Sequence, residues 1–259
     1  MQNYPPKKPY ATHCDSFAQS TKALKIGADG YRSLLLEAGL LLHHTLRKNH
    51  LRTSITMHRY LSYDDGKTEF EAYLALPCSK ETRSQGLLIA PTWAGRNSDA
   101  MRRADAFAAK GYASMVLDPY GQGRVGADRS QCAEMMSELM NDRELLFRRM
   151  QRALEVMKLQ EEVDAERIAA VGYCFGGLCV LDLARGGAIL RGVASLHGLF
   201  SAPDLPYSGP ITAKIMVLHG FEDPMATPDE GTLLGQELTR RGADFQIHYY
   251  GSTQHAFTN

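Results

Sequence analysis

From about residue 54 onward, apolar runs alternate with segments of helical periodicity along the chain. The first two runs, residues 54–63 and 69–77, are separated by Asp64, Asp65 and Gly66, and this pattern predicts two strands joined by a hairpin turn. The later runs are short and almost continuously apolar, which is typical of strands buried on both faces of a parallel sheet. We expect these strands at residues 86–93, 112–121, 167–174, 191–198, 213–220 and 244–251.

The segments between these strands predict helices. Apolar residues recur every three, four or seven positions from Leu139 to Met157, which predicts a long helical region from about residue 130 to 160. Further helices are predicted at residues 99–111, 178–185 and 229–242. Because strands with continuous apolar runs alternate with helices, the sequence predicts one doubly wound α/β domain whose sheet is mostly parallel.

The first 53 residues do not follow this alternation. Residues 1–16 have the composition of a disordered tail, and residues 29–48 have the pattern of a helix. We assign no chemistry to either part. The sequence therefore predicts an N-terminal extension, residues 1–53, followed by an α/β domain, residues 54–259.

Composition and charge narrow the classes of function. The chain carries 29 basic and 29 acidic side chains, so its formal net charge is zero, which argues against a nucleic-acid or anionic-membrane partner. The longest apolar stretch contains Glu37 and is too short to span a bilayer. Five cysteines without paired spacing favour reduced thiols, and hence a cytoplasmic location, over a disulfide framework. A homodimer is compatible with these properties.

One cysteine stands in a sharp turn flanked by glycines. Cys174 ends an apolar run and has Gly172 and Gly176 two positions before and after it. This is the arrangement of a nucleophile elbow, in which close packing excludes any side chain at the flanking glycines. The helix that follows favours a thiolate and places the backbone N–H of Phe175 to donate to an oxyanion. In a structural role, a cysteine here would be a small buried hydrophobe, and we expect Cys179 to be of that kind.

A cysteine nucleophile requires a base, and the base requires a group that orients it. In the fold that carries this elbow, the acid and then the histidine follow the nucleophile along the chain. Asp223 lies just beyond a predicted strand, with Glu222 as an adjacent alternative, and His255 lies beyond the last strand. The sequence therefore predicts a triad of Cys174, His255 and Asp223.

The other histidines are less well placed for this role. His197 and His219 each precede a glycine at a strand end, where we expect a packing role. His43 and His44 lie outside the predicted domain.

The motifs GYCFGG (residues 172–177), HGFEDP (219–224) and QHAF (254–257) resemble those of the dienelactone hydrolase family of α/β-hydrolases, over roughly residues 54–259. The resemblance implies an α/β-hydrolase fold and a Cys-His-Asp triad that hydrolyses esters or lactones through an acyl-enzyme, without metal or cofactor. It also implies that the backbone of Trp93 provides the second oxyanion donor and that its indole borders the substrate pocket. Packing at a strand end explains the Trp93 side chain equally well.

Two positions depart from the family. Dienelactone hydrolases carry a glutamate after the third strand that interacts with the nucleophile, and this chain has Thr92 there. They also use arginines to bind the substrate carboxylate, one of them four residues after the catalytic histidine, where this chain has Asn259. These differences predict a small-molecule ester or lactone that is less charged than a dienelactone. The candidate substrate-binding residues are Thr92, Arg96, Tyr120, Arg124 and Tyr173.

The C-terminus is a further difference. Related folds follow the histidine loop with a helix that covers the sheet, whereas residues 256–259 alone follow His255 here. From the sequence we expect that helix to be missing and His255 to lie on a tail that frays. The alternative function is accordingly a weakened or non-catalytic homologue that acts as a binding protein.

Two other chemistries have partial support in the sequence. Residues 121–126, GQGRVG, match the dinucleotide-binding pattern, but Asp118, Pro119 and Tyr120 stand between the apolar run and the first glycine. In addition, no strand ending in an acid follows about 20 residues later, where a long helix is predicted. Nicotinamide binding is therefore disfavoured. Within hydrolases, the same triad would also suit a phosphate triester or a thioester, because a triad determines the mechanism and leaves the pocket open.

Overall fold

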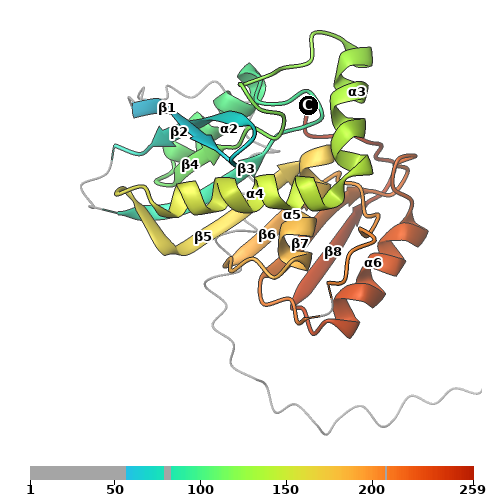
Figure 1. Cartoon of the computed structure of the whole chain (residues 1–259). Coiled ribbons are helices and arrows are strands. Elements are labelled where there is room, and N and C mark those ends of the chain that lie inside the picture. The colour runs from blue at the N-terminus through green and yellow to red at the C-terminus, as the bar shows by residue number, and fades with distance from the viewer. Residues whose placement is uncertain (1–56, 79–82, 208) are drawn as a thin grey trace, which may run out of the picture. The chain divides into compact units, whose positions relative to one another are not determined.

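The computed structural model describes residues 57–78, 83–207 and 209–259, so the predicted N-terminal extension and its helix lie outside the described residues. Within these ranges, eight strands form one sheet in the order β1-β2-β4-β3-β5-β6-β7-β8 (Figure 1). They are β1 (Met57–Asp64), β2 (Glu69–Leu76), β3 (Ser84–Ala90), β4 (Ala113–Val116), β5 (Val163–Tyr173), β6 (Gly192–Leu196), β7 (Lys214–Gly220) and β8 (Phe245–Tyr250). β1 and β2 form the predicted hairpin, and β2 also pairs antiparallel with β4. The remaining neighbours in the sheet pair in parallel, which confirms the predicted mostly parallel sheet.

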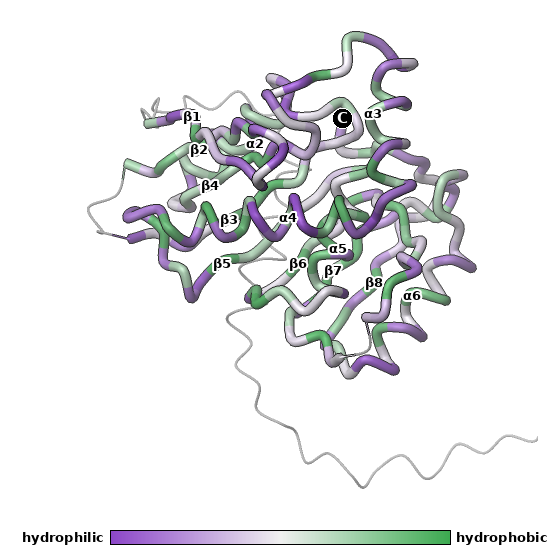
Figure 2. Tube along the Cα trace, in the orientation of Figure 1, coloured by the Kyte–Doolittle hydropathy of each residue, from purple (hydrophilic) through white to green (hydrophobic). Residues whose placement is uncertain are grey.

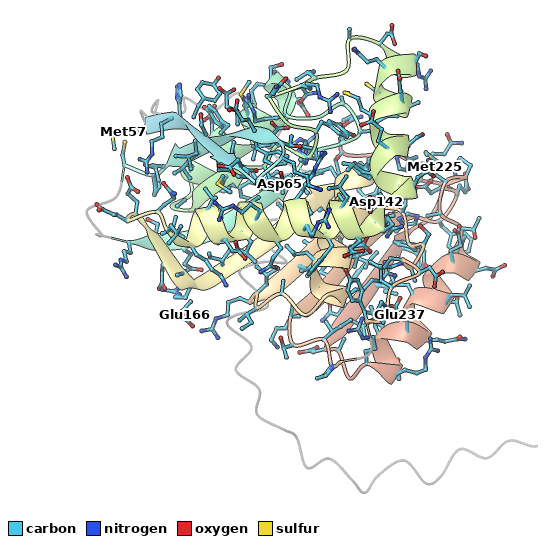
Figure 3. The ribbon with its side chains drawn as sticks, viewed as in Figure 1. Met57, Asp65, Asp142, Glu166, Met225 and Glu237 are labelled. Atoms are coloured by element: carbon cyan, nitrogen blue, oxygen red, sulfur yellow. The ribbon has the colours of Figure 1, made fainter. Side chains whose placement is uncertain are left out.

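Five helices accompany the sheet in the described ranges: α2 (Ser98–Ala108), α3 (Arg129–Asn141), α4 (Arg143–Lys158), α5 (Phe175–Arg185) and α6 (Pro228–Arg240). The helical region predicted at residues 130–160 is two helices, because it is interrupted at Asp142. The backbone of Asp142 leaves the helical region (φ −130°, ψ 79°), and its carboxylate accepts a hydrogen bond from the N–H of Leu145. Asp142, labelled in Figure 3, therefore caps the start of α4.

Two boundaries near the predicted elbow also differ from the sequence prediction. β5 begins at Val163 instead of residue 167, because it pairs with β3 from its first residue onward. α5 begins at Phe175 instead of residue 178. Gly176 and Gly177 have low helix propensity, but tertiary packing outweighs that propensity in the first turn of this helix.

Helices cover both faces of the sheet. Phe70 and Tyr73 lie an odd number of positions apart in β2, so they point to opposite faces. The ring of Phe70 lies 5.3 Å from the guanidinium of Arg149 in α4, whereas the hydroxyl of Tyr73 donates to Asp105 in α2 (2.8 Å). α4 and α2 therefore cover opposite faces, and α5 packs beside α4.

The hydrophobic core is continuous through α5. Figure 2 shows hydrophobic residues concentrated in the central strands and in α5, while α4 alternates between hydrophilic and hydrophobic positions. Every residue of α5 is buried, and its two charged residues are paired: Asp182 with Arg143 (2.6 Å) and Arg185 with Glu237 of α6 (2.8 Å). Buried charges are tolerated only when paired in this way, so the two ion pairs anchor α5 to its neighbours.

The carboxyl ends of the parallel strands meet at one edge of the sheet. Ala90 of β3 pairs with Gly172 of β5, and Gly220 of β7 pairs with Tyr250 of β8. The segments that follow these strands therefore come together where ligands bind in open α/β sheets. They carry Trp93, Cys174, Asp223 and His255.

Candidate active site

Cys174 lies at the tip of a strained turn between β5 and α5. Its backbone has φ 55° and ψ −119°, a conformation that residues other than glycine rarely adopt. A Cβ atom on Gly172 would overlap the carbonyl oxygen of Gly176, and one on Gly176 would overlap that of Ala90. The N–H of Cys174 donates to the carbonyl of Leu196 (3.1 Å), which ties the turn to β6. The structure thus has the geometry of a nucleophile elbow, with a partly exposed cysteine at its tip.

Of the three residues predicted as a triad, His255 lies within hydrogen-bonding distance of both Cys174 and Asp223. Nε2 of His255 is 3.1 Å from Sγ of Cys174, although the two residues are 81 positions apart. Nδ1 of the same ring is 2.7 Å from Oδ2 of Asp223. The adjacent Glu222 is exposed, and it is Asp223 whose carboxylate lies against the ring. Such a line of thiol, imidazole and carboxylate allows a proton to pass from sulfur to a ring that the carboxylate orients.

Asp223 is buried and has one further hydrogen bond and one further close contact. Its Oδ1 accepts from the N–H of Met225 (2.9 Å), and Nε2 of His219 lies 3.4 Å from its Oδ2. The same nitrogen of His219 lies 2.8 Å from the carbonyl oxygen of Ala226, so it carries the proton, because a carbonyl only accepts. Burial lowers the pKa of His219, which keeps that ring neutral. Contacts to both oxygens therefore hold the carboxylate in place beside His255.

The pKa of His255 is raised from its ordinary value of 6.5 to about 9. The hydrogen bond to Cys174 is the largest cause, burial acts in the opposite direction, and the hydrogen bond to Asp223 raises it further. Both partners favour the imidazolium because it donates to them and each can carry negative charge. His255 therefore retains a second proton to higher pH than an ordinary histidine.

His197 also borders the site, from the end of β6. Its ring is edge-on to that of His255, with ring centroids 5.1 Å apart, and its Nε2 lies 2.8 Å from Oγ1 of Thr258. Burial, followed by the neighbouring His255, lowers the pKa of His197 to about 4, so the ring is neutral at neutral pH. The packing role expected from the sequence omits the bond to Thr258. The position of His197 directly after a parallel strand is the sequence signal that could have placed it beside the site.

The two predicted oxyanion donors are connected through Tyr120. Phe175 is the first residue of α5, and the first N–H groups of a helix have no partner within it. The ring of Tyr120 stacks on that of Phe175 (centroids 6.3 Å apart, 3° between planes), and its hydroxyl donates to the carbonyl of Trp93 (2.8 Å). Tyr120 is only 1% exposed. Its side chain therefore packs between the segments of Phe175 and Trp93 rather than lining an open cavity, while the indole of Trp93 is half-buried against the core.

Two predicted substrate-binding residues make local hydrogen bonds in the loops beside the site. The hydroxyl of Thr92 accepts from the N–H of Ala94 at 3.4 Å, within the loop that follows β3. Arg124 is exposed and donates to the carbonyl of Tyr120 (2.6 Å). Both residues thus stabilise loop conformation.

The other two candidates are buried. Arg96 is 7% exposed and forms an ion pair with Glu71 of β2. Tyr173 is 6% exposed, and the guanidinium of Arg103 in α2 lies 4.2 Å from its ring centroid. The charge of Arg96 is therefore already compensated, and the ring of Tyr173 is packed beneath Arg103.

Among the cysteines, burial separates Cys174 from Cys179. Cys179 lies inside α5 and is 2% exposed, and burial raises its pKa well above the ordinary value. It is a core residue, as expected from the sequence. In the residues that the structure describes, no group of three or more histidine, cysteine, aspartate or glutamate side chains is arranged to hold a metal ion. No helix of this described part is both long and apolar enough to cross a membrane.

A mostly parallel eight-stranded sheet that carries an elbow cysteine, followed along the chain by the acid and the histidine, is the α/β-hydrolase fold. Similar solved structures include m3DLH, at 35% sequence identity and a TM-score of 0.75, covering 79% of this chain and 85% of that chain. A dienelactone hydrolase-like promiscuous phosphotriesterase from metagenomic libraries is similar at 31% identity, with the same TM-score of 0.75 and the same coverage of 79% and 85%. The model of the dienelactone hydrolase family matches residues 70–259. This chain belongs to the dienelactone hydrolase family, and it is a hydrolase.

Two curated proteins are similar in sequence to this chain, and one of them is named a hydrolase. A hydrolase named pyvD from Aspergillus violaceofuscus is 24% identical over 206 residues, which span 76% of this chain and 82% of the relative. An uncharacterised protein of Caenorhabditis elegans is 32% identical over 115 residues, or 43% of this chain and 72% of the relative. The family and the fold predicted from the sequence are thereby confirmed.

Proposed function

We propose that this protein hydrolyses uncharged carboxylic esters or lactones through a thioacyl-enzyme formed on Cys174. One observation carries the proposal: the hydrogen-bonded line from Sγ of Cys174 through the ring of His255 to Asp223, with distances of 3.1 and 2.7 Å, at the tip of the elbow. A nucleophile, its base and the orienting group of the base are the parts that acyl transfer requires.

In the proposed mechanism, the thiolate sulfur of Cys174 attacks the carbonyl carbon, a C–S bond forms, and the carbonyl electron pair moves to oxygen. The N–H groups of Phe175 and Trp93 hold this oxyanion. When the carbonyl re-forms, the C–O bond to the alcohol breaks and the His255 imidazolium gives its proton to the leaving alkoxide. Water then attacks the thioester, with His255 as base, and the products are the carboxylic acid and the regenerated cysteine–histidine pair.

The charges around the site support a neutral substrate. The guanidinium of Arg96 is paired with Glu71, and that of Arg103 is shared between Asp99 and the ring of Tyr173. Arg124 is turned toward a backbone carbonyl of its own loop. A substrate carboxylate would therefore have to displace existing contacts, whereas an uncharged ester would not.

The test is the hydrolysis of p-nitrophenyl acetate by the wild type and by Cys174→Ala. We expect release of p-nitrophenol that falls to background in the variant, and a mass increase of one acetyl group on Cys174 when the reaction is quenched early. Equal, near-background rates in both proteins, with a neutral lactone as a second substrate giving the same result, would contradict the proposal. The alternative of a binding protein would then be favoured.

A phosphate triester is the second candidate substrate. The observation that favours it is the 31% identity, over 79% of this chain, to a protein described as a promiscuous phosphotriesterase. The thiolate would form an S–P bond as the P–O bond to the leaving group breaks, and water would then release the phosphate diester. Hydrolysis of diethyl p-nitrophenyl phosphate that requires Cys174 would support this activity, and its absence in an enzyme active on esters would exclude it.

A catalytic thiol acts only while it is reduced. We therefore also propose a reducing compartment, the cytoplasm, as the place of this activity. Subcellular fractionation of cells that contain the protein tests this, and recovery in an oxidising compartment would contradict it.

A further inference from the structure

The segment that carries His255 is held on both sides of that residue, but by different means. Upstream, backbone hydrogen bonds join it to the end of β7: the N–H of Phe221 donates to the carbonyl of Tyr250 (2.9 Å), and that of Glu222 donates to the carbonyl of Thr253 (3.0 Å). Downstream, the contacts come from the side chains of other elements and converge on Thr258.

Two elements far apart in the sequence reach Thr258. Its hydroxyl oxygen lies 2.8 Å from Nε2 of His197, which follows β6. Its carbonyl oxygen accepts a hydrogen bond from Nη2 of Arg103 in α2 (3.2 Å). These contacts lie 61 and 155 positions away along the chain, so they define where the downstream side of the histidine loop sits relative to the sheet.

His197 is built as a fixed support. It is 1% exposed, its N–H donates to the carbonyl of Leu218 (2.9 Å), and its φ of 39° is unusual for a residue with a side chain. Its ring lies edge-on to both His255 and Phe257, with centroids 5.1 and 5.3 Å away. Strained backbone persists where the surroundings over-determine it, and such positions cluster at functional sites.

Arg103 connects the same threonine to the elbow. Its guanidinium lies 4.2 Å from the ring centroid of Tyr173, the residue directly before Cys174, and its Nε donates to Asp99 (3.1 Å). One side chain therefore contacts both the strand that ends at the nucleophile and the loop that carries the base. The distance between Cys174 and His255 depends on the relative position of those two segments.

We propose that His197 and Arg103 are positioning residues, which hold Thr258 and thereby keep Nε2 of His255 in register with Sγ of Cys174. The inference rests on the proposed function, in which His255 serves Cys174. Ala256, which lies between His255 and Thr258, has a φ of 61°, so this turn is strained and needs support on its downstream side. A misplacement of about 1 Å at a reacting pair costs on the order of a hundredfold in rate.

Thr258→Val tests the proposal because it removes the hydroxyl and keeps the shape of the side chain. We expect kcat to fall by roughly 10- to 100-fold with KM nearly unchanged, and Thr258→Ser to restore most of the loss. Arg103→Gln, which removes the charge and the fork of donors, should give a loss in the same direction. The matched control is Thr239→Val, because Thr239 is exposed on α6 and its hydroxyl donates only within that helix, to the carbonyl of Gly235 (2.8 Å). Thermal unfolding of all variants confirms that they are folded.

A second readout does not depend on turnover. In protein labelled with 13C-histidine, the His255 resonance, identified by its loss in His255→Asn, is titrated by NMR. The wild-type midpoint should lie near 9, where the contacts to Cys174 and Asp223 place it. In Thr258→Val it should move toward 6.5, because a displaced ring loses those contacts.

The outcomes separate the two proposals. If Thr258→Val and Arg103→Gln match the wild type in kcat and in the His255 midpoint while Cys174→Ala is inactive, the positioning proposal is overturned and the proposed function stands. If the wild type shows no hydrolysis that depends on Cys174, the proposed function fails, and the titration decides alone: a shifted midpoint in Thr258→Val supports the positioning role, and an unchanged midpoint overturns it.

Discussion

Asp223 and His255 are joined by a 2.7 Å contact between Oδ2 and Nδ1, although they follow different strands and lie 32 positions apart. The aspartate is buried and fixed by Met225 and His219, so it presents one defined oxygen to the ring. A carboxylate in this position selects the tautomer of the histidine and stabilises its protonated form.

Asp223→Asn should lower kcat on the order of a hundredfold to ten-thousandfold, with a much smaller change in KM, because the amide cannot stabilise the imidazolium. Steady-state kinetics on p-nitrophenyl acetate measure this. Glu222→Gln is the matched control, because Glu222 is the adjacent exposed carboxylate. An equal loss in Glu222→Gln, or activity retained in Asp223→Asn, would contradict the assignment of Asp223 as the acid.

The pH dependence of hydrolysis should report His255. Its pKa of about 9 means that the ring loses its second proton as the pH rises through that value. The leaving alkoxide then has no proton donor, so kcat/KM should decrease about tenfold per pH unit above 9. Rates are measured from pH 7 to 10.5 on a neutral alkyl ester, whose alkoxide must gain a proton as it leaves, with the rate of Cys174→Ala subtracted as background. A rate that keeps rising to pH 10.5 would contradict the pairing of His255 with Cys174.

Folding stability should depend on His197 at mildly acidic pH. Its pKa is about 4 in the folded protein against 6.5 ordinarily, so the unfolded chain binds the proton more readily. The contribution of His197 to the free energy of unfolding is therefore fully present above pH 6.5. It is lost as the pH falls from 6.5 toward 4, by up to about 3 kcal/mol. His197→Asn, whose side chain tolerates a positive φ, should have a smaller loss over this interval.

Urea unfolding at pH 7 and at pH 4.5 measures this difference. His219 shares the direction of the shift, so part of the acid loss should remain in His197→Asn. An identical loss in both proteins would show that His197 does not contribute.

Substitution of the elbow glycines should destabilise the fold. A Cβ atom on Gly172 meets the backbone of Gly176, which cannot move without shifting α5. We expect Gly172→Ala to cost about 3 kcal/mol or more. Gly209→Ala is the control, since a Cβ atom there has no neighbour within 4 Å. Urea unfolding of both variants checks the difference, and a cost below about 1 kcal/mol for Gly172→Ala would contradict the packing described.

Most strands and helices of the fold could be predicted from local sequence patterns. Continuous apolar runs identified the parallel strands, because a strand buried on both faces has no reason to alternate. The hairpin between β1 and β2 followed from alternation around Asp64, Asp65 and Gly66. Helix boundaries were less predictable: the break at Asp142 depends on a capping hydrogen bond, and the early start of α5 depends on packing that overrides the low helix propensity of Gly176 and Gly177.

The candidate nucleophile, acid and base could be identified from local motifs, because the elbow needs only a cysteine between glycines and the acid and the histidine follow it in a fixed order. How these residues meet depends on the folded chain. The contacts of Thr258 with His197 and Arg103 join segments 61 and 155 positions apart, and no local pattern encodes them. The burial of Tyr120 and the pairing of Arg96 with Glu71 could not be predicted from the sequence either. Side-chain contacts over such separations are set by the packing of whole elements, and therefore appear only when the chain is folded.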